Sequence, residues 1–499
     1  MLAALRPLAV PDEGRYAEIG RWMLQSGDWL VPRLNGIPFF HKPPLLHWLQ
    51  AGAMALFGEH AWSARLVPGL SAGLMLLALY LSARTLVDET VARRAAVMLG
   101  TGTAFLIGGQ YVNHDMLVAS WIGIAIWCFA LAFLHGERPH AGLARLGFIA
   151  CALGVLAKGL IGLALPGLAL LAWLLWTRQL RKVPYLPWFS GLALFALIAL
   201  PWFVLAQRQY PALFDYLFGA QQFGRYTGKT FNNPQPGWFY PVGLLLLLFP
   251  WAFWALAQIG RARRVAPALD SRVLALCWCW LIAIVGFFSV PRSKLIGYVL
   301  PVMPALALLA SLGWQRTMVH RRWARPVFAA LTALALGIAV TFTLLADRYT
   351  RNKTTGDIAI TLACRMQPDD TLYAVGGYPY DLPFLIQARR PMVVVQDWAE
   401  LRRSAGDSWS RELFEGADFE PAAGRLLQSP DVLPIASAEP GHWMVAPNDH
   451  PAGTWQLGWV RVQQGSGWSL YRSAPERPEP AQYKGLPGCR DHRGEQGQR

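Results

Sequence analysis

Long apolar stretches with few or no charged residues fill the sequence between about residues 63 and 346. A helix needs about 20 mostly apolar residues to cross the ~30 Å hydrocarbon core of a bilayer. The stretches therefore predict a polytopic all-α membrane protein, with about ten to twelve spans once a helix near the N-terminus is included. The spans assigned from the sequence are 63–83, 95–112, 116–135, 143–157, 160–177, 188–206, 238–258, 273–290, 295–314 and 326–346.

The distribution of basic residues gives the orientation of these spans. The net charge of +15 would by itself suit nucleic-acid binding, but only 15% of the residues are charged, against roughly 25% in soluble proteins. Arginine and lysine gather in every second predicted loop, which identifies those loops as cytoplasmic. These residues are Arg84, Arg93, Arg94, Arg138, Arg145, Arg178, Arg181, Lys182, Arg261, Arg263, Arg264, Arg272, Arg316, Arg321, Arg322 and Arg325. The charge therefore reflects orientation in the bilayer, and we expect no nucleic-acid partner.

The N-terminal region 1–62 and the tail 347–499 share the opposite side of the membrane. In a Gram-negative cell this side is the periplasm, so the sequence predicts a multi-pass inner-membrane protein whose active site faces the periplasm. Region 1–62 has the pattern of a truncated first helix followed by an amphipathic platform with a turn at Asn35-Gly36. Region 63–346 forms the transmembrane domain.

The tail changes character and is expected to leave the membrane. Region 347–474 predicts a small α/β domain, because short strand-like runs alternate with helical patterns. The predicted strands are 371–375, 392–395 and 443–446. Residues 475–499 are rich in Pro, Gly, Gln and charge, which predicts disorder. Cys364 and Cys489 both belong to this tail and would be able to pair in an oxidising compartment.

Acidic residues open two predicted helices on the periplasmic side. Asp12 and Glu13 precede an amphipathic helix, and Asp115 begins a span after Asn113-His114. Helix capping explains such acids without any catalytic role, since Asp is a favoured N-cap and acids are common in a first turn. Carboxylates at one membrane level are also able to hold an acceptor hydroxyl and remove its proton. Both interpretations stay open, and these three acids are the candidate catalytic residues.

Basic residues occur on the periplasmic side as well, although the positive-inside rule disfavours them there. Lys42 precedes two prolines, Lys158 lies at a tight loop, and Arg292 and Lys294 share a very short loop. Such cations suit an anionic head group, and arginine is well matched to phosphate. The candidate donor phosphate-binding residues are Lys42, Lys158, Arg225, Arg292, Lys294 and Tyr298.

The sequence contains no metal-binding motif with a recognisable spacing. His41, His47 and His114 fall on the periplasmic side, but imidazole alone does not specify a metal. His41 is kept as a candidate metal ligand and a divalent metal is left open, while no cofactor is predicted with certainty.

Several short motifs resemble, in order, those of one bacterial family. The residues that carry the resemblance are Pro11-Asp12-Glu13-Gly14-Arg15-Tyr16, Gly27-Asp28-Trp29, Pro32-Arg33-Leu34-Asn35-Gly36, Lys42-Pro43-Pro44-Leu45, Trp62-Ser63-Ala64-Arg65, Asp115-Met116, Ala157-Lys158-Gly159, Pro201-Trp202, Gly224-Arg225, Gln235-Pro236, Pro250-Trp251, Ser293-Lys294, Tyr298 and Leu300-Pro301. They cover roughly residues 11–310. Together they resemble the aminoarabinose-transferase-like branch of the protein O-mannosyltransferase superfamily.

The resemblance implies a GT-C fold glycosyltransferase that takes its sugar from a polyprenyl-phosphate donor. The implied acceptor is lipid A or another periplasmic glycan, lipid or protein. It further implies that Asp12 and Asp115 match the family's acidic positions, and that Lys42, Arg225 and Lys294 match its phosphate-binding positions. The chain departs from the family pattern at His41 and at Ala220-Gln221-Gln222, where many relatives carry acidic or histidine residues.

A lipid or solute transporter is the alternative hypothesis, because it would share the many spans and the basic rim. Transporters more often place ionisable groups near the middle of the membrane, on broken helices and in repeated halves. Here the spans are nearly free of charge and the polar residues gather at one face. The sequence therefore favours a membrane glycosyltransferase over a transporter or flippase.

Overall fold

The computed structural model describes residues 6–224, 234–259, 269–404, 406 and 408–475. The chain folds into two compact units. Unit 1 contains residues 1–40, 50–64 and 345–499, and unit 2 contains residues 41–49 and 65–344. The expected remnant of a first helix falls partly outside the described residues, and the expected disordered tail does so from residue 476 onward.

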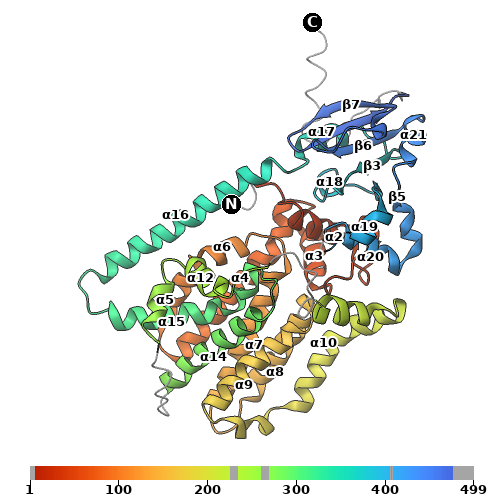
Figure 1. The fold of residues 1–499 in the computed structure, drawn as a ribbon. Helices are drawn as coiled ribbons and strands as arrows, with labels where there is room; N and C mark the ends of the chain where they lie inside the picture. The colour runs from red at the N-terminus through yellow and green to blue at the C-terminus, as the bar shows by residue number, and fades with distance from the viewer. Residues whose placement is uncertain (1–5, 225–233, 260–268, 405, 407, 476–499) are drawn as a thin grey trace. The chain divides into compact units, whose positions relative to one another are not determined.

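Within the residues that the structure describes, seven helices are long and apolar enough to cross a membrane. Figure 1 shows how they are arranged in the chain. They are α4 (Ala61–Leu86), α7 (His114–Leu134), α8 (Ala141–Lys158), α10 (Trp188–Gln209), α14 (Leu269–Ser289), the segment Ile296–Thr317 that joins η3 (Ile296–Val302) to α15 (Met303–Thr317), and α16 (Ala324–Arg351). Two shorter apolar helices, α3 (Leu45–Phe57) and α9 (Ile161–Trp176), accompany them. The prediction of a polytopic helical membrane protein is therefore confirmed.

Two of the predicted spans are interrupted. Predicted span 95–112 consists of α5 (Glu89–Gly100) and α6 (Thr103–Gly108), separated by Thr101 and Gly102. Predicted span 238–258 consists of α12 (Phe239–Leu247) and α13 (Ala252–Leu256), and Pro250 lies in the gap. Proline lacks the backbone N–H and glycine weakens a helix, so both breaks have a local cause in the sequence. The remaining helices of unit 2 are η1 (Leu180–Tyr185) and the π-helix η2 (Asp215–Gly224).

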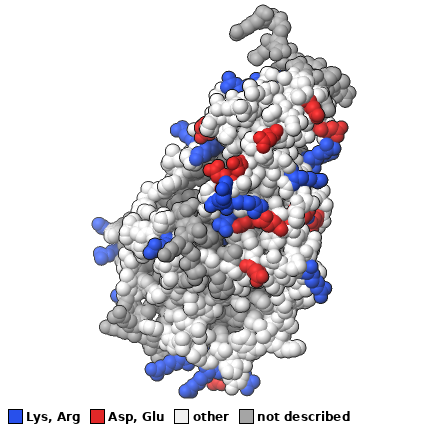
Figure 2. All heavy atoms as spheres, turned by 45° about the vertical axis from the view of Figure 1, so that its right-hand side comes forward, with Lys and Arg blue, Asp and Glu red and all other residues white. Residues whose placement is uncertain are grey.

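Small residues allow the helices of unit 2 to approach closely. Gly154 of α8 faces Gly162 of α9, and a Cβ on Gly162 would collide with the backbone of α8. Close backbone approach at small residues is the usual means of packing helices in a membrane. Large apolar side chains such as Phe189 and Leu197 of α10 point outward instead. Much of the face drawn in Figure 2 carries neither acidic nor basic side chains, as expected of a lipid-facing surface.

The tail in unit 1 forms a mixed six-stranded sheet with strand order β5-β4-β3-β6-β8-β7. The strands are β3 (Thr371–Val375), β4 (Val393–Val395), β5 (Leu427–Gln428), β6 (His442–Pro447), β7 (Trp459–Gln464) and β8 (Trp468–Ser473). The pairs among β3, β4, β5 and β6 are parallel, while β8 runs antiparallel to β6 and β7. The predicted α/β character is confirmed, and sequence reasoning missed the β7–β8 hairpin.

Short helices connect these strands. They are α17 (Gly356–Arg365), α18 (Leu382–Leu385), α19 (Trp398–Ser404), α20 (Arg411–Phe419), η4 (Pro421–Leu426), α21 (Val432–Ser437) and η5 (Thr454–Gln456). Cys364 of α17 is disulfide-bonded, and Cys489 lies outside the described residues. The disulfide bond fits an oxidising compartment for this part of the chain.

The N-terminal segment belongs to the same compact unit as the tail. It contains α2 (Asp12–Ser26) and a hairpin of β1 (Arg33–Leu34) and β2 (Ile37–Pro38). Asn35 and Gly36 both have positive φ, which confirms the predicted turn. The side chain of Asn35 donates to the carbonyl of Met392 and accepts from its N–H, each at 2.8 Å. Segments far apart in sequence are thus joined by paired hydrogen bonds.

Candidate functional site

Asp115 lies in the first turn of α7, but it does not cap this helix. Asn113 is the N-cap, and its side-chain oxygen accepts from the backbone N–H of Asp115 at 2.9 Å. The amide of Asn113 also donates to the Asp115 carboxylate at 3.2 Å. The capping interpretation of Asp115 is therefore wrong, because the asparagine two residues earlier already satisfies the helix terminus.

Lys158 and Tyr298 approach Asp115 from two other elements of unit 2. Lys158 is the last residue of α8 and forms an ion pair with the Asp115 carboxylate. Its ammonium nitrogen also lies 4.8 Å from the ring centroid of Tyr298 in η3. The ion pair is largely shielded, since the two side chains are only 13% and 15% exposed. Partial burial and the aromatic ring both strengthen such a charge pair.

Glycine permits this close approach. Gly297, next to Tyr298 in η3, lies against the Asp115 carboxylate, and a Cβ at this position would collide with it. Gly159 ends α8 at a φ of 84°, a conformation that favours glycine, directly after Lys158. The local sequence therefore positions all three members of the cluster Asp115–Lys158–Tyr298.

The other predicted phosphate-binding residues have different surroundings. Lys294 is buried and donates to the backbone carbonyl of Gln235 at 3.0 Å, where Pro234 and Ser293 form a β-bridge. Arg292 is exposed in the same short loop. Arg225 lies outside the described residues.

Lys42 and His41 precede α3 and belong to unit 2. Lys42 is half-buried, and His41 packs its ring edge-on against Tyr216 with centroids 5.7 Å apart. The part of the chain that the structure describes contains no group of three or more His, Cys, Asp or Glu residues arranged for a metal ion. The observed neighbour of His41 is the ring of Tyr216. That His41 binds a divalent metal stays a prediction.

Asp12 occupies the first turn of α2 in unit 1. Pro11 is the N-cap of α2 and makes no side-chain capping hydrogen bond. The Asp12 carboxylate instead pairs with the guanidinium of Arg15 at 2.6 Å and keeps 30% of its side chain exposed. The capping interpretation of Asp12 is therefore wrong as well. A carboxylate that is oriented by arginine and still reaches solvent is suited to contact a substrate.

Arg15 is the residue that fixes Asp12. It is 3% exposed and forms a second ion pair with Glu412 of α20, a residue of the tail. Its guanidinium lies 4.5 Å from the ring of Trp409 and 4.3 Å from that of Tyr16. Burial by itself lowers the pKa of Arg15, but the nearby carboxylates outweigh it and raise that pKa overall. Arg15 therefore stays charged and holds Asp12 in place.

Glu13 has a different environment from its neighbour. Its side chain is fully buried, pairs with Arg6 at 2.6 Å and accepts from the backbone N–H of Ala9 at 2.8 Å. These bonds tie the chain entering α2 to the helix itself. The geometry suits a structural role for Glu13 better than contact with a substrate.

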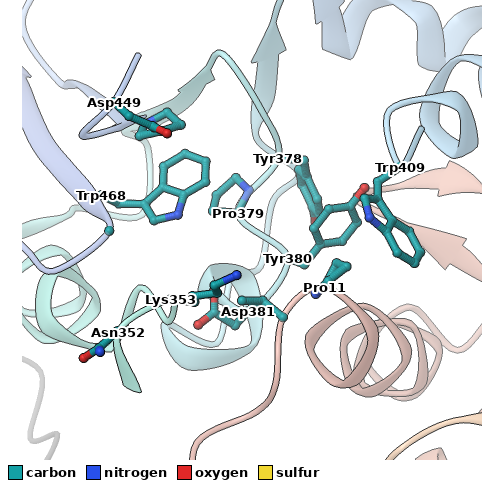
Figure 3. Close-up of a pocket in the computed structure, with 13 residues that line it drawn as sticks. Pro11, Asn352, Lys353, Tyr378, Pro379, Tyr380, Asp381, Trp409, Asp449 and Trp468 are labelled. Carbon is teal, nitrogen blue, oxygen red and sulfur yellow. The ribbon is translucent and has the colours of Figure 1, made fainter. Parts of the chain in front are cut away.

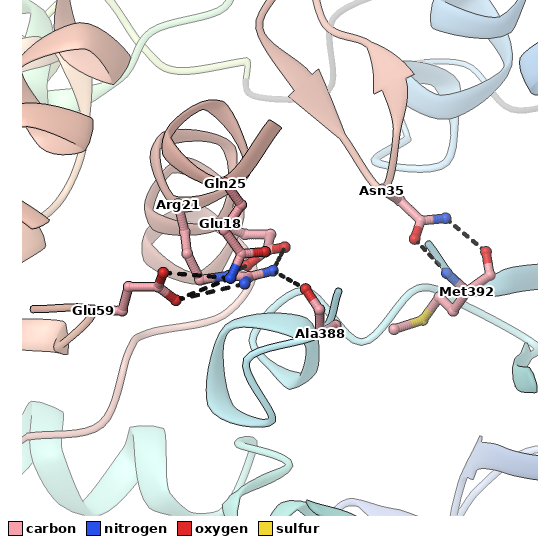
Figure 4. A network of polar contacts seen from close by, with 7 residues as sticks. All are labelled: Glu18, Arg21, Gln25, Asn35, Glu59, Ala388 and Met392. Carbon is pink, nitrogen blue, oxygen red and sulfur yellow. Dashed lines mark hydrogen bonds and ion pairs between the residues drawn. The ribbon is translucent and has the colours of Figure 1, made fainter. Parts of the chain in front are cut away.

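A buried ionic network lies further along α2 (Figure 4). Glu18 and Arg21 form two hydrogen bonds of 2.6 Å, and Arg21 donates to the carbonyl of Ala388 at 2.7 Å. Glu59 lies 3.6 Å from Arg21 and accepts from Gln25. Buried charges need such pairing to offset their desolvation. The network therefore fixes α2 against the tail.

Sequence reasoning missed Arg15, Glu412, Trp409 and the Glu18–Arg21 pair. A usable signal was present, because α2 places acidic and basic residues three positions apart on an otherwise apolar helix. The partner from the tail could not be read from the sequence, since Arg15 and Glu412 are 397 positions apart.

The chain is similar to known proteins over most of its length. A family model described as dolichyl-phosphate-mannose-protein mannosyltransferase matches residues 5–217. An undecaprenyl phosphate-alpha-4-amino-4-deoxy-L-arabinose arabinosyl transferase of Sodalis glossinidius is 32% identical over 420 residues, or 82% of this chain and 70% of that protein. A transferase of the same name from Pseudomonas aeruginosa is 33% identical, but the match spans only 60% of this chain and 55% of that relative.

Solved structures give a closely similar fold. The crystal structure of ArnT from Cupriavidus metallidurans bound to undecaprenyl phosphate superposes with a TM-score of 0.82. The sequences are 25% identical and the match covers 95% of both chains. An oligosaccharyltransferase of Archaeoglobus fulgidus, 14% identical with a TM-score of 0.50, shares the fold alone.

Proposed function

Because the chain belongs to the undecaprenyl phosphate-aminoarabinose arabinosyl transferase family, we propose that it transfers this aminopentose from undecaprenyl phosphate to a lipid A-like acceptor. The chain is a membrane glycosyltransferase of the mannosyltransferase superfamily. The predictions of family and enzyme class are confirmed. The identity of the acceptor is the more specific part of the proposal. Other periplasmic glycans, lipids or proteins are the alternative acceptors.

The Asp115–Lys158–Tyr298 cluster is the observation that carries this proposal. Three separate elements bring an acid, a base and a phenol together at the ends of apolar helices. Ionisable groups in such places are costly and usually functional. An ammonium group held by a carboxylate and a ring is able to turn toward a lipid-linked phosphate. Transporters more often place such groups near the middle of the membrane.

In the proposed reaction, an acceptor oxygen attacks the anomeric carbon of the sugar. The bond from that carbon to the phosphate oxygen breaks, and undecaprenyl phosphate leaves with the electron pair. Lys158, Lys42, Lys294, Arg292 and Arg225 are proposed to stabilise this phosphate, with Tyr298 as a hydroxyl donor. Most of the catalytic effect would then be electrostatic.

Asp12 is proposed to contact the acceptor, and Asp115 is proposed to assist it. A hydroxyl acceptor must lose its proton, so Asp12 would act as a base. A phosphate acceptor is already anionic, and Asp12 would then orient groups and offset basic charge. Arg15 fixes the Asp12 carboxylate in either case, whereas buried Glu13 supports the local fold.

We also propose the topology that this reaction requires. The interrupted helices α5–α6 and α12–α13, together with α9, would add three crossings to the seven long spans, giving ten. Region 63–346 would be the transmembrane domain, and regions 1–62 and 347–474 would face the periplasm of a bacterial inner membrane. The disulfide bond of Cys364 supports an oxidising location for the tail.

The direct test combines the purified chain with an undecaprenyl-phosphate-linked aminoarabinose donor and lipid A. Mass spectrometry should detect aminoarabinose-modified lipid A. Asp12→Asn should abolish transfer, while Asp369→Asn at an exposed surface pair serves as the matched control. Normal turnover of Asp12→Asn would remove Asp12 from the chemistry. If the wild-type chain modifies no acceptor and a deletion strain instead shows altered solute uptake, the transporter hypothesis replaces the proposal.

A further inference from the structure

A cavity of about 350 Å³ lies in unit 1, in the tail domain (Figure 3). Four aromatic side chains line it, namely Tyr378, Tyr380, Trp409 and Trp468. Pro11, the residue before Asp12, also lines it. The volume lies within the roughly 300–1,000 Å³ of small-ligand pockets, which typically combine aromatic walls with a few polar groups.

The sheet places this cavity where α/β proteins commonly bind ligands. From β3 the chain continues to β4 and then β5 on one side of the sheet. The next strand, β6, lies on the other side of β3, so the strand order reverses between β3 and β6. Tyr378 to Asp381 follow the end of β3, and Asp449 follows the end of β6. Ligands bind beyond the carboxyl ends of parallel strands at such a reversal.

The walls of the cavity are well fixed. Tyr378 and Tyr380 are buried and pack edge-to-face with ring centroids 4.9 Å apart. Asp381 accepts from Thr355 N–H at 2.9 Å and from the Thr354 hydroxyl at 2.5 Å. These bonds tie the loop after β3 to the segment that carries Asn352 and Lys353. A preformed pocket loses little entropy when a ligand binds.

Polar groups remain available at the rim. Asn352 and Asp449 are exposed, and within the described residues their side chains make no hydrogen bond or ion pair. Asp449 and Trp468 lie on one side of the cavity, and Tyr378, Tyr380 and Trp409 lie on the other (Figure 3). Flat aromatic faces offer surfaces to C–H groups, while an amide and a carboxylate bind hydroxyl or ammonium groups.

We infer that this cavity is a carbohydrate subsite that holds a sugar ring of one of the two substrates. A sugar ring has a C–H face for the aromatic side chains and hydroxyl groups for Asn352 and Asp449. A phosphate group fits less well, because the lining contains two carboxylates and a single lysine. Lys353 is moreover engaged with Tyr349, to whose hydroxyl it donates at 2.5 Å. The inference deepens the proposed function and rests on it for the identity of the sugar.

Contacts within unit 1 link the subsite to the candidate catalytic acid Asp12. Trp409 lines the cavity and stacks on Arg15, which holds Asp12. A sugar ring in the cavity would therefore lie close to the helix terminus that carries Asp12. Trp468 lies on the opposite side of the cavity from Trp409 (Figure 3), so it is the better residue to vary.

The experiment measures binding of soluble sugars to the full-length chain by saturation-transfer NMR. The two probes are a glucosamine disaccharide without acyl chains and methyl 4-amino-4-deoxy-L-arabinopyranoside. Trp468→Ala should weaken binding of one probe about tenfold, the effect of losing one good aromatic contact. Trp468→Tyr should restore most of it, and Leu457→Ala, an exposed apolar position in the same domain, should have no effect.

Steady-state transfer distinguishes the source of the sugar. A raised KM for the acceptor alone in Trp468→Ala assigns the subsite to the acceptor glycan, and a raised KM for the donor alone assigns it to the donor sugar. The inference is overturned if wild-type chain binds neither probe, or if Trp468→Ala binds both as wild type does while remaining folded. If the subsite inference fails but the chain still transfers the sugar, the proposed function stands. If the probes bind but no transfer occurs, the proposed function is overturned and the sugar-binding site stands.

Discussion

At the scale of single residues, charged side chains that stand alone in the sequence form ion pairs in the structure. Asp115 is bound to Lys158, and Asp12 is bound to Arg15. An isolated charge near a membrane is expensive, whereas a paired charge keeps its ionised form and its direction. The side chains of the candidate catalytic acids are thereby oriented.

The Asp115–Lys158 pair should behave as a unit in catalysis. Lys158→Met should lower kcat/KM about 100-fold, comparable to removing one electrostatic donor from an active site. The double variant with Asp115→Asn should be little worse than the single variants, because groups that act together are not additive. Transfer kinetics with varied donor concentration measure both. Lys182→Met, which removes a lysine bound to two backbone carbonyls on a basic loop, is the control, and fully multiplicative losses would contradict the idea.

Asp381 gives a pH dependence of stability. Burial raises its pKa above the ordinary 3.8, although hydrogen bonds from Thr354 and Thr355 oppose this effect. An acid with a raised pKa stabilises the fold most when protonated, and that stabilisation is lost as pH rises through the raised value. The melting temperature of wild type relative to Asp381→Asn should therefore fall as the pH increases above 3.8. A relative increase over this range would contradict the assignment.

At the scale of elements, α2 and the β1–β2 hairpin depend on the tail for their position. Gly14 of α2 lies against the backbone of Tyr380, and Gly416 of α20 lies against Pro38 of β2, so a Cβ at either glycine would collide. Asn35 adds its two hydrogen bonds to Met392. The elements that carry Asp12 are therefore held by residues that follow the last membrane helix.

Replacing Asn35 tests this attachment. Asn35→Ala removes two buried hydrogen bonds and a side chain that tolerates positive φ, so it should lower the free energy of unfolding of unit 1 by about 2–3 kcal/mol. Thermal unfolding and limited proteolysis in detergent measure the loss. Asn448→Ala is the matched control, since the exposed Asn448 side chain also makes two hydrogen bonds: it donates to the carbonyl of Gly465 and accepts from the hydroxyl of Ser469. Equal stability of the two variants would show that the hairpin does not need this contact.

At the scale of the whole molecule, the proposed topology puts the basic loops and the disulfide-bonded tail on opposite sides of one membrane. Membrane-impermeant thiol labelling of cells with a permeabilised outer membrane tests this. Ser429→Cys in the tail should be labelled, and Gly136→Cys in a basic loop should be labelled only after lysis; both positions are exposed in the structure. Labelling of Gly136→Cys alone in unlysed cells would reverse the proposed orientation.

The sequence by itself determined the membrane character, the family and the identity of most candidate site residues. Apolar length and the placement of basic residues are local properties, so they can be read without tertiary contacts. It also placed the Asn35-Gly36 turn and strands β3, β4 and β6 nearly as observed.

Only the tertiary structure decided what Asp12 and Asp115 do in the folded chain. Both have the sequence context of a helix cap, yet Pro11 and Asn113 occupy the cap positions. Their partners come from different elements, and the Arg15–Glu412 pair joins residues 397 positions apart. Such pairings depend on which surfaces fold together, and neither helical periodicity nor local propensity carries that information. The aromatic cavity has the same origin, because six separate segments of the chain contribute to its lining.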